Sequence, residues 1–387
     1  MPTQINLPYA IEQNNLLPAP SGQQAATFAQ SNGGAADFSW EQKDVIEFLS
    51  RGESYGLPDE PVERIVTHGA IIFLLKDRAY KLKRAICFAS LDYTTASLRK
   101  QACYAELRLN KRAAPRLYLD VWAIHRDRNG VLAFNGPGPA VEHVVVMRRF
   151  AQSNQFDVLA ERGCLTRQLV SALAAEIARF HGAAQPSRAF GGAQGIRWAI
   201  AENFRELERL APLLKKSAVS ALRGEMTARF HHLIPVLEQR RNRGLVRRGH
   251  GDLRLANVCL FEGKPTLYDC IEFSAPLAWT DVLYDLAFLL VDLDLRGHSD
   301  LAALALKRYR EIAGNVDDFQ VLPLFLALRA AARSWTLAGS ALRRQEPHEA
   351  RSRLQRAQRY LAASYRYLAV PPAWLPQGTD KTRRMSP

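Results

Sequence analysis

The sequence predicts an α+β protein of two lobes, a small lobe built on an antiparallel sheet and a larger lobe that is mostly helical. One observation is the stretch 62–83, in which three short apolar-rich runs are separated by His68-Gly69 and Lys76-Asp77, the pattern of an antiparallel meander. Another is the region from about Phe156 onward, where apolar residues recur at helical spacing in successive segments. With 387 residues, the chain is long enough for two lobes with a substantial core.

Changes in composition mark the boundaries of the lobes. We predict that residues 1–38 form a disordered tail, because the first 37 residues contain no Lys or Arg and are rich in Gln, Asn, Ala, Ser, Gly and Pro. The small lobe is assigned to residues 39–149 and the larger lobe to residues 150–370. Pro371-Pro372 open a basic segment, 371–387, that we expect to be flexible.

The formal net charge of +14 favours nucleotides, polyanions or acidic substrates as ligands. The basic residues are dispersed along predicted helices without interleaved aromatic residues, so we do not expect a nucleic-acid partner. No apolar run reaches the ~18 residues that cross a bilayer, and the first residues lack the features of a secretory signal. The five cysteines form no C-x-x-C pair, which is typical of reduced thiols. We therefore predict a cytoplasmic protein without a membrane partner.

The small lobe contains a candidate buried ion pair. The helix predicted over 95–112 has an apolar stripe, and Glu106 lies beside that stripe. A carboxylate that faces a core needs a cationic partner, and Lys81, near the end of the third strand of 62–83, is the preferred one. Lys83 points to the same side of the strand, so the choice between the two lysines stays open. Two further strands are predicted around Asn129-Gly130, and a buried strand over 144–149 leads into the larger lobe.

The helix predicted through 322–337 in the larger lobe carries Arg329 and Arg333 one turn apart on an otherwise apolar surface. Two such arginines either bind an anionic group of a substrate or pair in a structural network with Asp292 and Asp294, which are expected to follow the preceding helix. The sequence does not decide between these two roles.

The stretch that carries most of the chemistry runs from Arg248 to Asp269. It consists of a polar loop, a short apolar strand, a Glu-Gly-Lys turn and a second strand that ends at Asp269. A hairpin of this kind holds Asn257 and Asp269 at the ends of neighbouring strands, where both can face one cation. Asp252 precedes Asn257 by five residues. Two oxygen ligands for a hard cation, together with a carboxylate that receives a hydroxyl proton, are what metal-assisted phosphoryl transfer requires.

The spacing from His250 to Asp252, Asn257 and Asp269 resembles the catalytic and metal-binding loops of the protein-kinase-like fold. With Gly251 in second position, the pattern looks most like the aminoglycoside phosphotransferase family, in which an Asp followed by Leu-Ala, here Asp285 to Ala287, opens a helix beneath the catalytic loop. The resemblance implies a bilobal fold, ATP and Mg²⁺ as cofactors, and transfer of the γ-phosphoryl group to a hydroxyl of a small molecule.

The resemblance also implies roles for individual residues. Asp252 is expected to act as the base, Asn257 and Asp269 to hold Mg²⁺, and His250 and Asp285 to fix the loop. Lys81, braced by Glu106, is expected to hold the α- and β-phosphates. The backbone near Met147 and Arg148 is expected to receive adenine. Apart from the resemblance, Glu272 is a candidate for the substrate site because it follows Asp269 closely, and Arg329 and Arg333 are candidates in the first of their two possible roles.

The sequence departs from the family in several ways. Arg254 and Ala256 occupy loop positions where His and a small residue such as Gly are expected, and the small lobe has no Gly-x-Gly-x-x-Gly. A strongly basic protein is also a poor binder of polycationic aminoglycosides. The chain is similar to the kinase-like domain that precedes a P-loop ATPase domain in some bacterial proteins, but contains no Gly-x-x-x-x-Gly-Lys-Ser/Thr motif itself. The alternative interpretation is a catalytically degenerate module that binds a nucleotide or a partner, and burial of Arg254 across the acceptor site would favour it.

Overall fold

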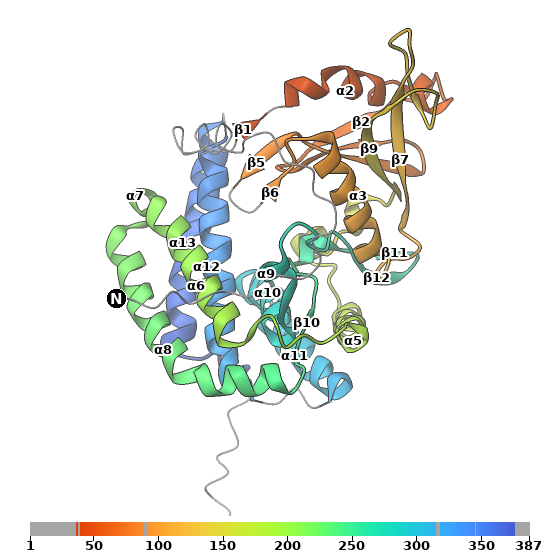
Figure 1. Ribbon diagram of the computed structural model, residues 1–387. Helices are drawn as coiled ribbons and strands as arrows, with labels where there is room; N and C mark the ends of the chain where they lie inside the picture. The colour runs from red at the N-terminus through yellow and green to blue at the C-terminus, as the bar shows by residue number, and fades with distance from the viewer. Residues whose placement is uncertain (1–35, 38, 89–90, 315–317, 345, 376–387) are drawn as a thin grey trace, which may run out of the picture.

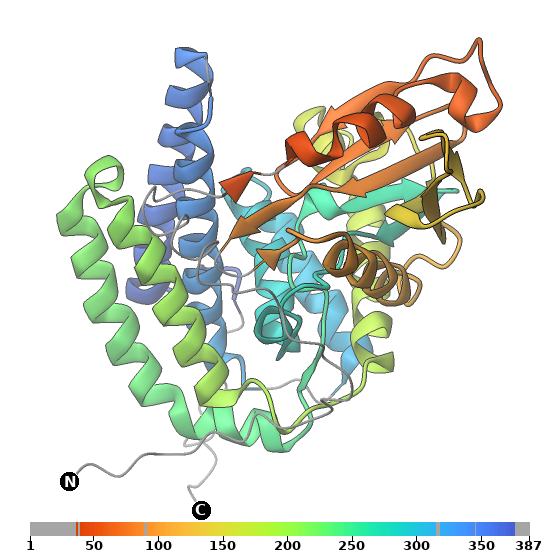
Figure 2. The same cartoon turned by 45° about the horizontal axis from the view of Figure 1, so that its top comes forward.

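The computed structural model describes residues 36–37, 39–88, 91–314, 318–344 and 346–375. It confirms the predicted fold class, because a small lobe with an antiparallel sheet stands beside a larger helical lobe (Figure 1). Turning the molecule shows the sheet and its helix α3 (Ala96–Asn110) resting over the strands and helices of the larger lobe (Figure 2).

The small lobe contains a six-stranded antiparallel sheet in the order β2-β3-β4-β9-β7-β8. Its strands are β2 (Glu63–Val66), β3 (Ala70–Leu74), β4 (Arg78–Lys83), β7 (Tyr118–Arg126), β8 (Leu132–Phe134) and β9 (Ala140–Arg148). A second, three-stranded sheet consists of β1 (Ala36–Asp37), β5 (Ile86–Phe88) and β6 (Leu91–Asp92). The turns predicted at His68-Gly69 and Lys76-Asp77 lie between β2, β3 and β4 as expected.

Strand β4 separates two chemical environments because successive side chains point to opposite faces of a sheet. Tyr80 and Leu82 belong to the apolar cluster that also contains Val45 and Leu49 of helix α2 (Lys43–Leu49). Lys81 and Lys83 have the other parity and reach Glu106 of α3. The start of α3 is fixed by Thr95, whose hydroxyl accepts a hydrogen bond from the Leu98 N–H.

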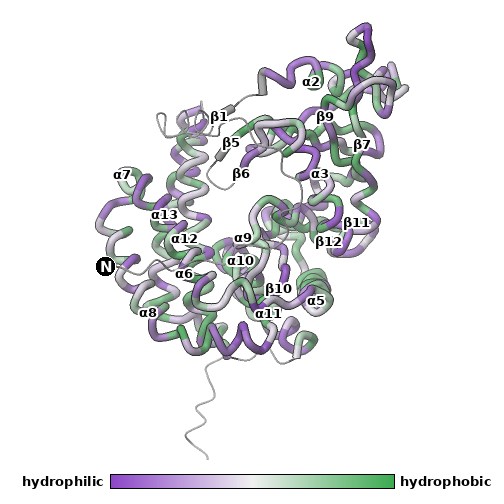
Figure 3. The backbone as a smooth tube through the Cα atoms, viewed as in Figure 1, coloured by the Kyte–Doolittle hydropathy of each residue, from purple (hydrophilic) through white to green (hydrophobic). Residues whose placement is uncertain are grey.

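The larger lobe is a helical assembly with short pairs of strands. Its helices are α4 (Phe156–Glu161), α5 (Arg167–Ala183), α6 (Gly192–Arg209), α7 (Ala211–Leu214), α8 (Lys216–Asn242), α9 (Ala275–Ala278), α10 (Val282–Leu295), α11 (Ser299–Ala313), α12 (Leu322–Ala341) and α13 (Pro347–Ala369). Apolar and polar segments alternate along outer helices such as α8 (Figure 3), whereas twelve of the fourteen residues of α10 are buried. Helix α10 is therefore the centre of this lobe, and the segment before it carries the predicted catalytic loop.

The predicted hairpin is present as β11 (Val258–Phe261) and β12 (Lys264–Leu267). Val258 pairs with Leu267, and the pairing continues past the end of β12, where the Tyr268 N–H donates to the Asn257 carbonyl. Asn257 and Asp269 thus flank the same end of one hairpin, as the sequence predicts. Strands β10 (Val246–Arg248) and β13 (Trp279–Asp281) pair next to it.

Three expectations about the chain need correction. Residues 36–37, assigned to the N-terminal tail, form β1; the rest of that predicted tail lies outside the described residues. Of the segment assigned to the C-terminal tail, Leu375 is buried and Trp374 donates a hydrogen bond to Asp294, so residues 371–375 pack against the larger lobe, whereas 376–387 also lie outside the described part. Asp292 and Asp294 lie inside α10, not after it.

Among the residues that the structure describes, one segment is long and apolar enough, by length and composition, to span a membrane. It is Phe319–Ala341, which includes α12, although no uninterrupted apolar run in the sequence reaches that length. In the structure, 78% of its most apolar window is buried inside the protein. Burial of this kind is typical of a core helix, whose apolar surface is covered by neighbouring helices.

Candidate active site

Two lysines of β4 share the buried carboxylate of Glu106. Lys81 Nζ lies 2.7 Å from Glu106 Oε1, and Lys83 Nζ lies 2.5 Å from Glu106 Oε2. The predicted Lys81–Glu106 pair is therefore present. The sequence posed a choice between Lys81 and Lys83, but both lysines pair with Glu106. Burial raises the pKa of Glu106, but the two ammonium groups outweigh it and hold the pKa at about 2.

The carboxylate of Glu106 makes the free energy of unfolding depend on pH. The folded-state pKa of Glu106, about 2, is below its usual 4.5, so its contribution is complete above pH 4.5 and is lost as the pH falls toward 2. Urea unfolding at several pH values measures this effect. As the pH falls through that window, we expect the free energy of unfolding of the wild type to fall by up to about 1.4 kcal/mol per pH unit more than that of Glu106→Gln. Equal slopes for the two proteins would contradict the pairing.

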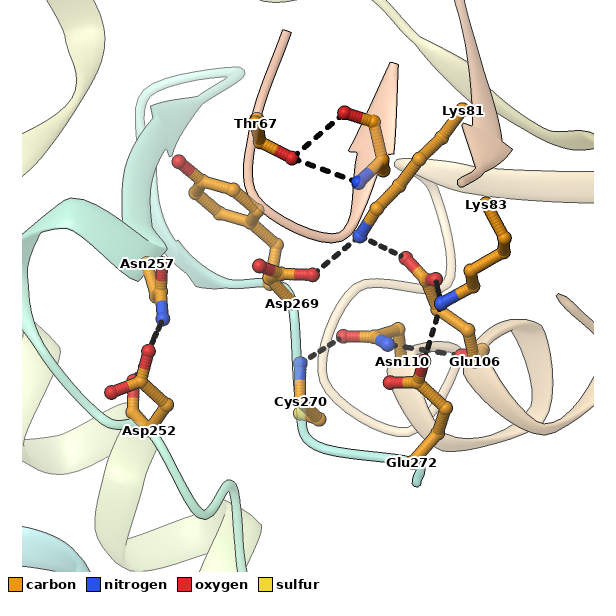
Figure 4. A network of polar contacts seen from close by, with 12 residues as sticks. Thr67, Lys81, Lys83, Glu106, Asn110, Asp252, Asn257, Asp269, Cys270 and Glu272 are labelled. Atoms are coloured by element: carbon orange, nitrogen blue, oxygen red, sulfur yellow. Dashed lines mark hydrogen bonds and ion pairs between the residues drawn. The ribbon is translucent and has the colours of Figure 1, made fainter. Parts of the chain in front are cut away.

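The lysines diverge beyond Glu106 (Figure 4). Lys81 Nζ also lies 2.5 Å from Asp269 Oδ1, which brings the amine to the predicted metal ligand. Lys83 instead pairs with Glu272, whose carboxylate also accepts a hydrogen bond from the Tyr93 hydroxyl. Only Lys81 therefore connects Glu106 to the hairpin end that carries Asp269.

Asp269 has a left-handed backbone, with φ of 65°, a conformation that is unfavourable for a residue with a side chain. Several hydrogen bonds hold it there. The Asp269 N–H donates to the Tyr118 hydroxyl at 3.1 Å, the Cys270 N–H donates to Asn110 Oδ1 at 2.9 Å, and the Ile271 N–H donates to the His250 carbonyl at 2.9 Å. The carboxylate of Asp269 is 46% exposed, so the strained backbone presents it to the space between the lobes.

Asp252 and Asn257 lie together on the facing loop. The side-chain N–H of Asn257 donates to Asp252 Oδ2 and to the Asp252 carbonyl, both at 2.8 Å. Because the amide nitrogen faces Asp252, the amide oxygen Oδ1 is directed away from that carboxylate. The predicted proton acceptor and one predicted metal ligand are thus oriented by each other.

Arg254 grips the same carboxylate with both arms of its guanidinium. Its Nε lies 2.7 Å from Asp252 Oδ1 and its second terminal nitrogen lies 2.8 Å from Oδ2. Burial raises the pKa of Asp252, but Arg254 outweighs it and lowers the pKa well below the usual range. Only 17% of the Arg254 side chain is exposed. The arginine that stands where the resemblance predicts a histidine therefore contacts the predicted base directly.

Asp285 holds the loop that carries Asp252 in place through hydrogen bonds to its backbone. This fully buried carboxylate accepts hydrogen bonds from the His250 N–H at 2.6 Å, the Gly251 N–H at 2.9 Å and His181 Nε2 at 3.1 Å. Glycine is required at position 249, because a Cβ there would stand 2.5 Å from Asp285 Oδ2. His250 Nε2 in turn donates to the Tyr268 carbonyl at 2.9 Å, which connects the loop to the hairpin.

Two residues assigned to the substrate site have internal partners instead. Arg329 is buried, donates to the Tyr284 and Gly251 carbonyls, and lies 3.7 Å from Asp285. Glu272 is bound by Lys83. Their contacts favour a structural role for both, and Arg329 pairs with neither of the aspartates considered in the sequence analysis. Arg333, by contrast, has no ion-pair partner among the described residues.

The backbone N–H of Arg148, which was expected to be available to adenine, is already hydrogen-bonded within the protein. The Arg148 N–H donates to the Leu117 carbonyl at 2.9 Å, and the Arg149 N–H donates to the Asp77 carbonyl at 2.8 Å. Met147 lies in β9, between β4 and β7. The Arg148 side chain pairs with Glu262 of the β11–β12 turn at 2.5 Å, so this residue bridges the two lobes.

Sequence reasoning missed Tyr118 and Asn110. Asn110 is one helical turn beyond Glu106, a spacing that places both on one face of α3, so its approach to the site had a signal in the sequence. Tyr118 had none, because its hydroxyl meets Asp269 across a separation of 151 residues. His181 is buried and its Nε2 lies 3.1 Å from Asp285 Oδ2.

The residues present fit a hard divalent cation. Asp269 offers a partly exposed carboxylate, and the contact of Asn257 with Asp252 leaves its amide oxygen directed elsewhere. Carboxylate and amide oxygens are ligands suited to Mg²⁺, which usually takes only one or two of them from the protein and completes its shell with water and phosphate oxygens.

No family model matches the chain. Uncharacterized proteins of Mycobacterium tuberculosis and Mycobacterium bovis are 30% identical to it over 292 residues, which cover 73% of this chain and 56% of each relative. The chain therefore spans just over half the length of the curated relatives it matches.

The solved structures that the chain resembles include small-molecule kinases. A GDP complex of aminoglycoside 2'-phosphotransferase-IIIa aligns with a TM-score of 0.47 and 17% identity, covering 82% of this chain and 98% of that one. A ternary complex of another aminoglycoside phosphotransferase with AMP-PNP and hygromycin B gives 0.47 and 15%, covering 82% and 98%. A glucosamine kinase gives 0.44 and 15%, covering 82% and 84%.

Proposed function

We propose that the chain is a phosphotransferase of the aminoglycoside phosphotransferase family, which transfers the γ-phosphoryl group of ATP to a hydroxyl of a small molecule. The observation that carries the proposal is a pair of contacts at one end of the β11–β12 hairpin. Asp252 is hydrogen-bonded to Asn257, and Lys81 is paired with Asp269. Phosphoryl transfer depends mainly on placement and charge neutralisation, and these four side chains supply both.

Each residue then has a defined task. Asp252 orients the acceptor hydroxyl and takes its proton as the new O–P bond forms and the bond to the β-phosphate oxygen breaks, so that ADP leaves. Lys81, held by Glu106, neutralises phosphate charge, and Asp285 with His250 keeps the loop in place. Asn257 and Asp269 would hold Mg²⁺, which supplies charge neutralisation at the phosphates. We also propose that the protein acts in the cytoplasm, which its five free cysteines support.

A second candidate function is the non-catalytic nucleotide- or partner-binding module. The observation that favours it is the bidentate contact of Arg254 with Asp252, which occupies both oxygens of the proposed base. A base that stays in this contact cannot take a proton from a hydroxyl. The two candidates therefore differ in whether Asp252 is released when an acceptor binds.

Release of ADP from Mg·ATP, and of GDP from Mg·GTP, in the presence of a panel of hydroxylated metabolites tests the proposal. We expect at least one metabolite to be phosphorylated. Lys81→Met is expected to lower turnover by about 10²-fold or more, whereas Lys83→Met, whose amine contacts Glu272 instead of Asp269, keeps most of it.

The paired lysine variants also act as each other's control, because both remove one partner of Glu106. A larger loss in Lys83→Met would assign the phosphate contact to Lys83. Nucleotide binding without turnover of any metabolite would favour the non-catalytic module.

A further inference from the structure

We infer that the acceptor carries an anionic group, a carboxylate or a phosphate, and that Arg333 together with Arg254 binds it beside Asp252. This inference rests on the proposed phosphotransferase function and names the chemical class of its substrate. It starts from the distribution of charge on the larger-lobe side of the site, where α10, α12 and the Asp252 loop meet.

The carboxylates of this region already have guanidinium partners of their own. Asp252 is bound by Arg254 at 2.7 Å, Asp292 by Arg296 at 3.0 Å, and Asp285 lies 3.7 Å from Arg329. Asp292 also accepts hydrogen bonds from the Leu255 N–H and the Tyr360 hydroxyl, so its oxygens are mostly engaged. Arg333 is left over, with no carboxylate within 4 Å in the part of the chain that the structure describes.

Arg333 lies at the acceptor side of the site. It is one helical turn beyond Arg329, on the same face of α12, and Arg329 reaches the Gly251 carbonyl of the Asp252 loop. The Phe288 ring is contacted by the guanidiniums of both Arg329 and Arg254, at 5.0 and 5.6 Å. The charges of both Arg254 and Asp252 act on Arg333, which places Arg333 near that pair.

The environment of Arg333 opposes its charge. Burial lowers the pKa of Arg333, and the neighbouring guanidinium of Arg254 lowers it further; Tyr360, Asp292 and Asp252 offset these effects only in part. Unpaired charges in partly buried surroundings are costly, and two guanidiniums that face the same space are stabilised by an anion that both can bind. Arg333 is only partly buried, so a ligand can reach it.

An anionic acceptor would also free the proposed base. The guanidinium of Arg254 forms both of its hydrogen bonds with Asp252, and an incoming carboxylate or phosphate competes for the same N–H groups. Once Arg254 turns toward the anion, Asp252 regains an oxygen that can take the hydroxyl proton. A neutral or cationic acceptor has no group that competes for Arg254, so the base stays occupied.

The kinetic test measures KM and kcat for glycerol, glycerate and glycerol 3-phosphate as acceptors. All three carry hydroxyls, and they differ in whether and which anionic group is present. Further matched sets of this kind widen the panel. We expect the anionic members to be the better acceptors. Arg333→Gln should raise KM for them about tenfold or more, the effect of one charged hydrogen bond, with a much smaller change in kcat. Arg333→Lys should restore part of the affinity. Arg351→Gln, an exposed arginine on α13, is the matched control and should change nothing.

The binding test does not depend on turnover. Calorimetry with glycerate and glycerol 3-phosphate, in a Lys81→Met background that removes the phosphate-binding amine of the other lobe, should show binding that Arg333→Gln abolishes. A preference for neutral acceptors, with KM unchanged in Arg333→Gln, would overturn the inference and leave the phosphotransferase function intact. If nothing is phosphorylated, the proposed function fails, and equal binding by Arg333→Gln and its parent would overturn the anion site as well.

Discussion

Asp252→Asn is expected to lower phosphoryl transfer by about 10²-fold or more, the usual contribution of a positioned general base. The amide has the shape of the carboxylate but cannot take the hydroxyl proton. Nucleotide affinity should change little, because Lys81 and Asp269 lie on the other side of the site and the new amide keeps an oxygen that can accept the hydrogen bond from Asn257. Steady-state ADP release and calorimetric titration with Mg·ATP measure the two quantities separately.

Asp300→Asn is the matched control for this change. Asp300 is a surface aspartate, 67% exposed, that also pairs with an arginine, Arg167, so the same substitution there should leave turnover unaltered. Melting temperatures should show that both variants are folded. Wild-type turnover in Asp252→Asn would remove the base from the proposed mechanism.

Asp285→Ala is expected to destabilise the protein by about 3–5 kcal/mol, the range for removing one partner of a buried ion pair. The change leaves the buried guanidinium of Arg329 without its carboxylate and removes the acceptor for the His250 and Gly251 N–H groups. Urea unfolding of wild type and variant measures the difference in the free energy of unfolding.

The surface pair again provides the control, since Asp300→Ala should cost no more than about 1 kcal/mol. A second variant, Asp285→Asn combined with Arg329→Met, removes both charges and should be more stable than Asp285→Ala. A loss of less than about 1 kcal/mol in Asp285→Ala would mean that this carboxylate does not hold the loop.

Most of the fold was accessible to sequence reasoning because it depends on short-range patterns. Alternation in 62–83 predicted β2, β3 and β4, and the helices predicted over 95–112 and through 322–337 correspond to α3 and α12. The hairpin was predictable for the same reason, since a short turn between two apolar runs leaves one pairing that places Asn257 and Asp269 at the same end.

The partners of the charged residues were less accessible. Strand parity correctly placed Lys81 and Lys83 on one face, but their different second partners, Asp269 and Glu272, come from a segment 188 and 189 residues away. Arg329 was expected to bind a substrate or the aspartates at 292 and 294, and contacts Asp285 instead.

The sequence by itself determined the two lobes, the hairpin and the order of the chemical groups along it, because these follow from periodicity and from the geometry of short turns. The tertiary structure alone decided which charges neutralise each other: that Arg254 occupies Asp252, that Lys81 and not Lys83 reaches Asp269, and that Arg333 is left without a carboxylate among the described residues. The physical reason is that an ion pair depends on a few ångströms between side chains from distant segments, a distance that the packing of the whole chain sets.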